Sequence, residues 1–331
     1  MQTPLDTSPA SSLETPTEMT VYQAPAGFLN DLLAELALAG ITPRAVREPL
    51  VLVDGPPLPL AWVQNVWPRA VFLPAPSIGQ AAKALKALGR NWAALPLDHF
   101  RRTALIQEKL PKVSARPLSF GQPKPGAPLG AWTLWEEDTI LASAAATSPF
   151  ARGEARFEED RTGPPNRAYL KIWEALTLLG HGLGHGPGPG DLCLDLGGSP
   201  GGWAYVLAGL GSRVFCVDKA PLDAAVAALP NVEYCRGSAF SLEPAWTGPV
   251  DWFFSDVICY PARLLTLVRA YLDAKACANF VVTLKFQAAT DHEAAQAFAA
   301  IPGARLVHLF HNKHELTFLL TGPKPALFPA D

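Results

Sequence analysis

The segment DLGGSPGGW, residues 195–203, is a glycine-rich loop whose first residue is an aspartate. It follows the apolar run LCL at residues 192–194, which predicts a buried strand. In an open α/β sheet, ligands bind beyond the carboxyl ends of the strands, and glycines there let the backbone approach the ligand closely. A helix is expected next, with Pro200 in its first turn and Ser199 as its cap. The pattern indicates a ligand site; the alternative is a tight turn that binds nothing.

The residue types in the loop narrow the class of ligand. The dinucleotide pattern G-x-G-x-x-G needs glycine at 199 or 200, and a Walker loop needs Gly-Lys-Ser/Thr; neither is present, which disfavours a nicotinamide-dependent dehydrogenase. An aspartate would repel a pyrophosphate but attract the ammonium and sulfonium groups of S-adenosylmethionine. One strand later, Asp218 ends the run VFCVD, where its carboxylate can accept from ribose hydroxyls. We therefore predict an S-adenosylmethionine site formed by Asp195, Gly197, Gly198, Ser199, Pro200, Gly201, Gly202, Trp203 and Asp218.

Four further charged residues each stand at the end of an apolar element. They are Lys171 at the start of a predicted helix, Asp256 ending DWFFSD, Lys285 in VVTLKF, and Glu315 in HELTFLL. A lysine that follows an apolar strand is costly to bury unless a carboxylate meets it. For any one of these residues taken alone, a structural ion pair is the better explanation. All four on one frame, beside a predicted cofactor loop, favour a catalytic group.

The elements that would position these residues alternate between strand and helix. The strand-like runs are DLCLDLG, RVFCVD, VDWFFSD, NFVVTLKF, ARLVHLF and ELTFLL, separated by helix-length segments. This alternation predicts a doubly wound, mostly parallel sheet with both faces covered. The last two runs are joined only by HNKH, which is too short for a crossover helix. The sheet should therefore end in an antiparallel hairpin.

The N-terminal part of the chain predicts a smaller α+β unit. Helices are expected at residues 28–40 and 77–89, a strand at PLVLVDG, and a hairpin in GAWTLWEEDTILASAA that turns at Glu137 and Asp138. The chain has 331 residues, of which 49% are hydrophobic, so it is long enough to form two domains that each bury a hydrophobic core.

Charge and cysteine usage narrow the partners and the compartment. The net charge of −3 gives no global sign of a polyanionic partner, but residues 83–124 hold nine basic side chains against Asp98 and Glu108. Such an excess either follows phosphates or is a solvated surface. No apolar run reaches the ~18 residues of a membrane span, and the five cysteines form no C-x-x-C pair, so we expect a cytoplasmic protein without a membrane partner or metal site. The basic residues are Lys83, Lys86, Arg90, Arg101, Arg102, Lys109, Lys112, Arg116 and Lys124.

Taken together, the motifs resemble the FtsJ-like ribose 2′-O-methyltransferases, and most closely the RlmM type, which modifies a cytidine of large-subunit ribosomal RNA. The residues that carry the resemblance are NRAYLK, DLGGSPGGW, VFCVDKAP, SDVICYPARL, VVTLKF and LFHNKHELTFLL. The resemblance spans roughly residues 145–320. It implies a class I methyltransferase fold, Rossmann-like, with a seven-stranded sheet. The N-terminal resemblance is confined to APAGFLNDLLAEL, although the RlmM type carries a THUMP-containing RNA-binding region there.

The resemblance also implies roles for the four charged residues. In that family a Lys-Asp-Lys-Glu tetrad surrounds the target 2′-hydroxyl, and the matching positions are Lys171, Asp256, Lys285 and Glu315. We expect Lys285 to be the base that Asp256 orients, and Lys171 to contact the incoming alkoxide. Asp256 also lines the cofactor site. Many relatives read the adenine amino group with an aspartate near position 238, where this chain has Ser238.

These inferences lead to one organisation and one function, with alternatives. We predict a flexible tail at 1–18, an N-terminal α+β domain at 19–150 that helps to hold RNA, a methyltransferase domain at 151–325, and a tail at 326–331. The predicted reaction is S-adenosylmethionine-dependent 2′-O-methylation of ribosomal RNA or a ribosomal particle. The alternatives are the same chemistry on transfer RNA or a messenger cap, and a non-catalytic RNA-binding or ribosome-assembly factor. The sequence leaves the oligomeric state open.

Overall fold

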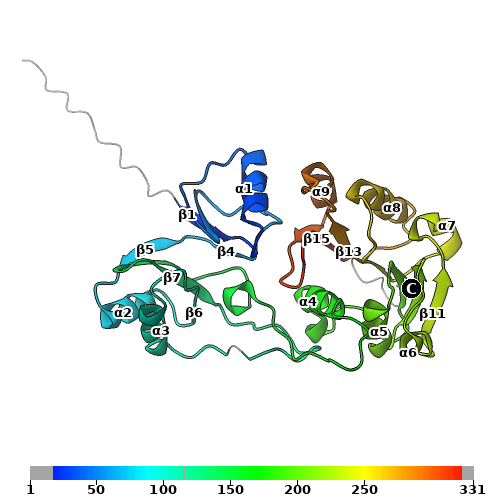
Figure 1. Cartoon of the computed structure of the whole chain (residues 1–331), viewed down its shortest axis with the longest axis horizontal. Helices are drawn as coiled ribbons and strands as arrows, with labels where there is room; N and C mark the ends of the chain where they lie inside the picture. Colours follow the sequence, from blue (N-terminus) through cyan, green and yellow to red (C-terminus); the bar gives the residue numbers. More distant parts are fainter. Residues whose placement is uncertain (1–17, 115, 323–331) are drawn as a thin grey trace, which may run out of the picture.

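The computed structural model describes residues 18–114 and 116–322 (Figure 1). Within these residues the strands form two four-stranded sheets in the N-terminal part and one seven-stranded sheet in the remainder. The predicted tail at 326–331 lies outside the described residues, as does all of the tail at 1–18 except Glu18. No helix of the described part is long and apolar enough to span a bilayer.

The first sheet is entirely antiparallel and has the order β2-β3-β1-β4. One of its two inner strands, β1, is buried along its whole length because both of its faces are covered. Tyr22 and Leu32 belong to one apolar cluster, whereas Met19 and Val21 belong to the layer shared with the second sheet. The elements are β1 Met19–Gln23, α1 Leu29–Leu38, β2 Ala45–Arg47, β3 Leu50–Asp54 and β4 Asn65–Trp67.

The second sheet has the order β5-β8-β7-β6 and carries two helices. The helix α2 begins after Ser77, whose side chain accepts a hydrogen bond from the backbone of Gln80, and it buries Ala81, Ala82 and Leu85. The predicted hairpin is present as β7 and β8. The elements are β5 Val71–Pro74, α2 Ile78–Leu88, β6 Trp92–Ala94, α3 Phe100–Glu108, β7 Gly130–Glu136 and β8 Thr139–Ser143. What the sequence predicted as one α+β unit therefore contains two sheets that share an apolar layer.

The seven-stranded sheet confirms the predicted topology. Its order is β11-β10-β9-β12-β13-β15-β14; the first five strands are parallel, and β15 pairs antiparallel with both β13 and β14. The strands are β9 Leu192–Leu196, β10 Arg213–Asp218, β11 Val232–Arg236, β12 Trp252–Ser255, β13 Phe280–Lys285, β14 Arg305–Val307 and β15 Glu315–Leu320.

Helices cover both faces of this sheet, on the right of Figure 1. They are α4 Tyr169–Leu179, α5 Gly202–Gly209, α6 Ala224–Ala227, α7 Pro244–Thr247, α8 Pro261–Asp273 and α9 His292–Ala299. One face packs α8 and α9 against Phe253, Phe280 and Phe318, and the other packs α4 and α5 against Cys193 and Phe254. The strand order reverses between β9 and β12, and this switch point is where open α/β sheets bind ligands.

The first N-terminal sheet is joined to the larger sheet by an aromatic cluster. Phe28 and Trp62 lie against His308 and His314, with ring centroids 5.1–5.7 Å apart. Phe286, which follows β13, lies 5.9 Å from Trp62. The N-terminal part therefore contacts the segments that directly adjoin Lys285 and Glu315.

Candidate active site

The glycine-rich loop holds a carboxyl group that is completely buried. Asp195, in β9, has 0% exposure, and its Oδ1 has no hydrogen-bond partner within the described residues. Its Oδ2 lies 3.7 Å from Cys216 Sγ, which is a weak donor. Burial, reinforced by the nearby charge of Asp256, raises the pKa of the Asp195 carboxyl to about 7. A buried acceptor without a partner is costly, so Asp195 Oδ1 is available to a hydrogen-bond donor that enters the site.

Two glycines are required because the backbone here approaches its neighbours closely. A Cβ atom on Gly198 would stand 2.5 Å from Asp195 Oδ2, and one on Gly197 would stand 2.6 Å from the Cα of Val257. Gly197 also has φ +75°, a conformation that L side chains rarely adopt. A larger residue at 198 would therefore displace the Asp195 carboxyl, and one at 197 would displace the backbone at Val257, just after β12.

The predicted helix cap is wrong. The helix α5 begins at Gly202, after Gly201 in the left-handed conformation, so Ser199 and Pro200 precede the helix. The Ser199 hydroxyl instead donates to the carbonyl of Pro221 at 2.8 Å, and its backbone N–H donates to Asp218 Oδ2 at 3.0 Å. The turn is thus closed by Asp218, whose other oxygen accepts from Ala220. Each carboxylate oxygen keeps a lone pair that can accept a further hydrogen bond.

Two other predicted cofactor contacts are partly occupied by the protein itself. Trp203 is buried, and its indole N–H donates to the carbonyl of Ala168, so it packs α5 against α4. The Ser238 hydroxyl accepts from the backbone of Phe240 at 3.3 Å. The Phe240 ring in turn lies 4.0 Å beneath the guanidinium of Arg263.

The four charged residues form one ion-pair network at the carboxyl edge of the sheet. Lys171 Nζ lies 2.6 Å from Asp256 Oδ1 and 3.2 Å from Glu315 Oε1. Lys285 Nζ lies 3.3 Å from Asp256 Oδ2. Asp256 therefore bridges the two ammonium groups, and Lys171 is paired with two carboxylates. The side chains are only 9–21% exposed, so these pairs are weakly screened by water.

The fold explains why these four residues meet. Asp256 directly follows β12, and Lys285 is the last residue of β13, the neighbouring parallel strand. Glu315 begins β15 and is the cross-strand partner of Lys285. Lys171 comes from the first turn of α4, which packs on the sheet beside β9.

Sequence reasoning missed Glu174, a buried carboxylate one turn after Lys171. It is 4% exposed and accepts from the backbone N–H groups of Phe310 and His311, and from His311 Nδ1 at 2.8 Å. These bonds fasten the turn that precedes Glu315 to the helix that carries Lys171. A glutamate inside the apolar sequence IWEALTLL was the available signal.

Two histidines in the turn between β14 and β15 have side chains that contact other elements. His311 is half-buried against Glu174, and His314 lies between Thr290 and Asp31. Both are held by partners on other elements because the turn packs against α4 and against α1, rather than projecting into solvent.

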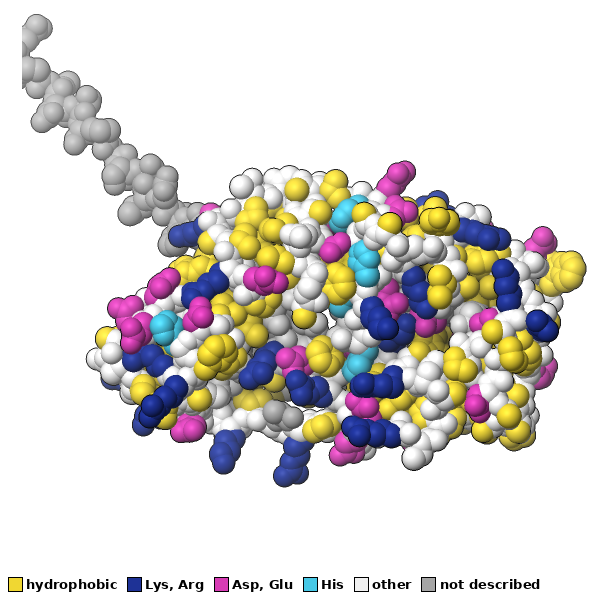
Figure 2. All heavy atoms as spheres, in the orientation of Figure 1, with side chains coloured by type: hydrophobic (Ala, Val, Ile, Leu, Met, Phe, Trp, Pro, Cys, Tyr) yellow, Lys and Arg dark blue, Asp and Glu magenta, His cyan; other side chains and the backbone are white. Residues whose placement is uncertain are grey.

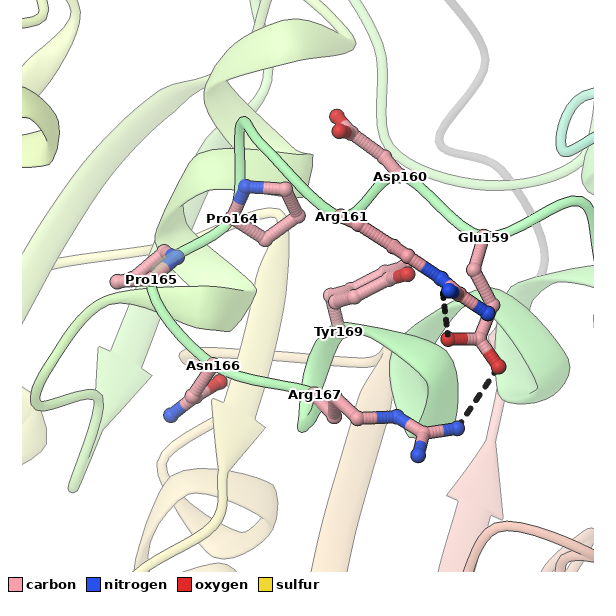
Figure 3. A pocket seen from close by; sticks show the side chains of 8 residues that line it. All are labelled: Glu159, Asp160, Arg161, Pro164, Pro165, Asn166, Arg167 and Tyr169. Atoms are coloured by element: carbon pink, nitrogen blue, oxygen red, sulfur yellow. Dashed lines mark hydrogen bonds and ion pairs between the residues drawn. The ribbon is translucent and has the colours of Figure 1, made fainter.

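An open pocket of about 510 Å³ adjoins the glycine-rich loop (Figure 3). Arg161 and Arg167 converge on the carboxylate of Glu159 on its wall, at 4.0 and 2.7 Å. Asn166 borders the loop, since a Cβ atom on Gly202 would overlap its side-chain oxygen. The lining residues are Glu159, Asp160, Arg161, Pro164, Pro165, Asn166, Arg167 and Tyr169.

Comparison with known proteins finds a family model that matches the part of the chain containing Lys171, Asp195, Asp256 and Lys285. Residues 165–294 match the family model described as FtsJ-like methyltransferase. A protein of Alkalilimnicola ehrlichii called Ribosomal RNA large subunit methyltransferase M is 29% identical over 92% of this chain and 94% of its own length. A protein of the same name from Azoarcus sp. is 30% identical over 67% of this chain and 63% of its own length. A solved structure from Plasmodium falciparum is described as a ribosomal RNA methyltransferase. The match covers 47% of this chain and 96% of that one, with 16% identity and a TM-score of 0.35.

Proposed function

We propose that the protein transfers a methyl group from S-adenosylmethionine to a ribose 2′-hydroxyl of large-subunit ribosomal RNA, in the cytoplasm. The match of residues 165–294 to the FtsJ-like methyltransferase model, and the similarity to a large-subunit ribosomal RNA methyltransferase, support this proposal. The observation that carries the proposal is the Lys171–Asp256–Lys285 ion-pair network next to the buried carboxyl of Asp195. Within that RNA we propose a cytidine as the target. Transfer RNA and messenger caps are the competing substrates.

The residues at the switch point fit S-adenosylmethionine. The unpartnered Asp195 Oδ1 would accept from its ammonium group, and the Asp218 carboxylate would accept from its ribose hydroxyls. Glycine at 197 and 198 lets the loop backbone pack closely against Val257 and the Asp195 carboxyl, which holds the loop beside the end of β9. When bound, this cofactor supplies a methyl group activated by its positive sulfur.

The tetrad has the charges needed to deprotonate a hydroxyl and stabilise the resulting alkoxide. A ribose hydroxyl is a poor nucleophile and must lose its proton as it attacks. Lys171 is paired with two carboxylates and Lys285 with one, so Lys285 gives up less ion pairing when it loses a proton. We assign Lys285 as the base and Lys171 as the fixed positive charge beside the alkoxide. Asp256 holds both lysines, and Glu315 holds Lys171, so that the hydroxyl is presented in line with the methyl carbon.

Cofactor affinity is expected to rise with pH around neutrality. The pKa of Asp195 is raised to about 7, so its carboxyl is neutral below that pH and charged above it, and only the charged form attracts a cation. Affinity for S-adenosylmethionine should fall about tenfold between pH ~8 and pH ~6. Calorimetric titration across this range measures the slope. The Asp195→Asn variant should bind weakly throughout and lack this slope; because the cofactor amine titrates equally with both proteins, equal slopes would contradict the assignment.

The reaction itself is tested by methyl transfer from labelled S-adenosylmethionine into large-subunit RNA that lacks its own 2′-O-methylation. Digestion to nucleosides and mass spectrometry should give 2′-O-methylcytidine. A different 2′-O-methylated nucleoside would keep the chemistry and replace the target. Cofactor binding without incorporation into either naked RNA or subunit particles would favour a non-catalytic RNA-binding role.

We further propose that the N-terminal sheets help to hold RNA through the basic residues of α2, α3 and the segment that follows. Lys83, Lys86 and Arg90 are exposed on or just after α2, and Arg101 is exposed on α3. In Figure 2, blue side chains gather over α3 and along the following segment. Arg102 and Lys124 are less available, because each donates to a backbone carbonyl.

Charge reversal in this region is expected to weaken RNA binding and its salt dependence together. In the Lys86→Glu/Arg101→Glu variant, the slope of log affinity against log salt should fall by about one for each phosphate that the variant no longer binds. Titrations of RNA at several salt concentrations measure it. Arg269→Glu, an exposed change on α8, is the matched control. An unaltered slope in the double variant would remove these residues from the RNA path.

A further inference from the structure

The loop that follows Asp256 exposes two large apolar side chains beside the tetrad. Ile258 and Tyr260 are each 73% exposed, whereas Cys259 between them is 7% exposed and packs into the core. Among the described large hydrophobic residues, only Trp246 is more exposed, at 79%. Exposed apolar groups that cluster at a functional site commonly mark a binding surface.

The backbone of this loop is fixed at both ends. Asp256 is held by its two lysines and by its backbone N–H, which donates to the carbonyl of Leu196. Tyr260 is the cap of α8, and its carbonyl accepts from the backbone N–H of Arg263 at 3.0 Å. The two apolar side chains are therefore presented on a fixed support rather than on a free tip.

Arg263, in the first turn of α8, places a positive charge close to Tyr260 in the chain. Its side chain is exposed, and its guanidinium stacks 4.0 Å above the Phe240 ring. The Arg263 guanidinium makes no hydrogen bond or ion pair with residues 18–114 or 116–322. Its N–H donors, arranged in the plane of the group, suit the oxygens of a phosphate.

We propose that Ile258, Tyr260 and Arg263 form a subsite for the nucleotide that adjoins the target ribose. The base stacks on Tyr260 and Ile258, and its phosphate binds Arg263. Stacking is tolerant of sequence because every base has an aromatic face, so this subsite holds the RNA strand without selecting the target. The subsite rests on the proposed function, since it requires an RNA strand at the tetrad.

Binding and turnover of variants test the subsite. The probe is a short oligocytidylate RNA, titrated at several salt concentrations with the S-adenosylhomocysteine-bound protein. Tyr260→Ala should weaken binding on the order of tenfold with little change in salt slope, and Tyr260→Phe should restore most of the affinity. Arg263→Gln should reduce the slope by about one. In methyl transfer, Tyr260→Ala should raise KM for RNA more than it lowers kcat.

The control is Trp246→Ala, because Trp246 is slightly more exposed than Tyr260 but lines a groove with Leu192 and Arg213 at the opposite ends of the strands. The subsite would be overturned if Tyr260→Ala bound RNA as tightly as the wild-type protein, or if Trp246→Ala weakened binding equally. The proposed function would still stand in that case, provided that the wild-type protein methylates RNA. Failure of the wild-type protein to bind or methylate any RNA would overturn both. Cofactor affinity, measured in parallel, should be unchanged in all these variants.

Discussion

Replacing Lys285 with alanine is expected to slow methyl transfer by about 10²–10⁴-fold while cofactor affinity stays nearly unchanged. Lys285 Nζ contacts Asp256 alone among the carboxylates of the network, so it is the lysine freest to accept the proton of the hydroxyl. Alanine removes the base but leaves the glycine loop, Asp195 and Lys171 in place. Single-turnover methyl transfer with saturating RNA measures the chemical step, and calorimetry measures cofactor binding.

Lys285→Arg separates the role of a base from that of a positive charge. Arginine keeps the charge but does not lose its proton at accessible pH, so this variant should be as slow as alanine. Lys275→Ala, an exposed change after α8, is the control for removal of a lysine. Turnover near the wild-type rate in Lys285→Arg would show that the position supplies charge alone, and the base would then have to be sought elsewhere.

The sequence was sufficient to predict the strands that carry the site, because buried parallel strands are continuous apolar runs bounded by polar residues. Thus β9, β12 and β13 were recognisable from LCLDL, WFFS and FVVTLK. The edge strand β11 was not among the predicted runs. Its sequence VEYCR buries only Val232, so it lacks an apolar signal, and neighbouring β10 determines that it is a strand. The division of the N-terminal part into two sheets depends on long-range pairing and was likewise not predicted.

The site residues, too, were predictable where the signal lies in the local sequence, and not where it depends on contacts between segments far apart in the chain. A charged residue at the end of an apolar strand is visible in the sequence, and this sufficed to propose Asp256 and Lys285. Glu174 was missed because its partners lie 136 and 137 residues further along, on a turn that returns to α4 only in the folded chain. The prediction that Ser199 caps the helix was wrong because Asp218, from the next strand, accepts from the Ser199 backbone and closes the turn. The helix therefore begins only at Gly202.

Asp256→Asn is expected to have the second large effect, since Asp256 is the common partner of both lysines. The change leaves two ammonium groups with Glu315 as their only nearby carboxylate within the tetrad. Methyl transfer should fall about 10²-fold or more because neither lysine is held in place. The free energy of unfolding should fall by about 1–3 kcal/mol, less than for a fully buried pair because the groups remain partly accessible to water. Single-turnover kinetics and chemical denaturation measure these effects, and Asp273→Asn on the exposed end of α8 is the control.

The same variant should also shift the pH dependence of cofactor binding. Burial is the first cause of the raised pKa of Asp195, and the charge of Asp256 is the second. Removing that charge lowers the pKa of Asp195, so its carboxyl ionises at lower pH and the rise in cofactor affinity should begin below pH ~7. A general loss of structure would weaken binding at every pH without moving the midpoint. An unmoved midpoint in a folded Asp256→Asn protein would mean that the two carboxyl groups are electrostatically independent, and the tetrad would then act on the hydroxyl without tuning the cofactor site.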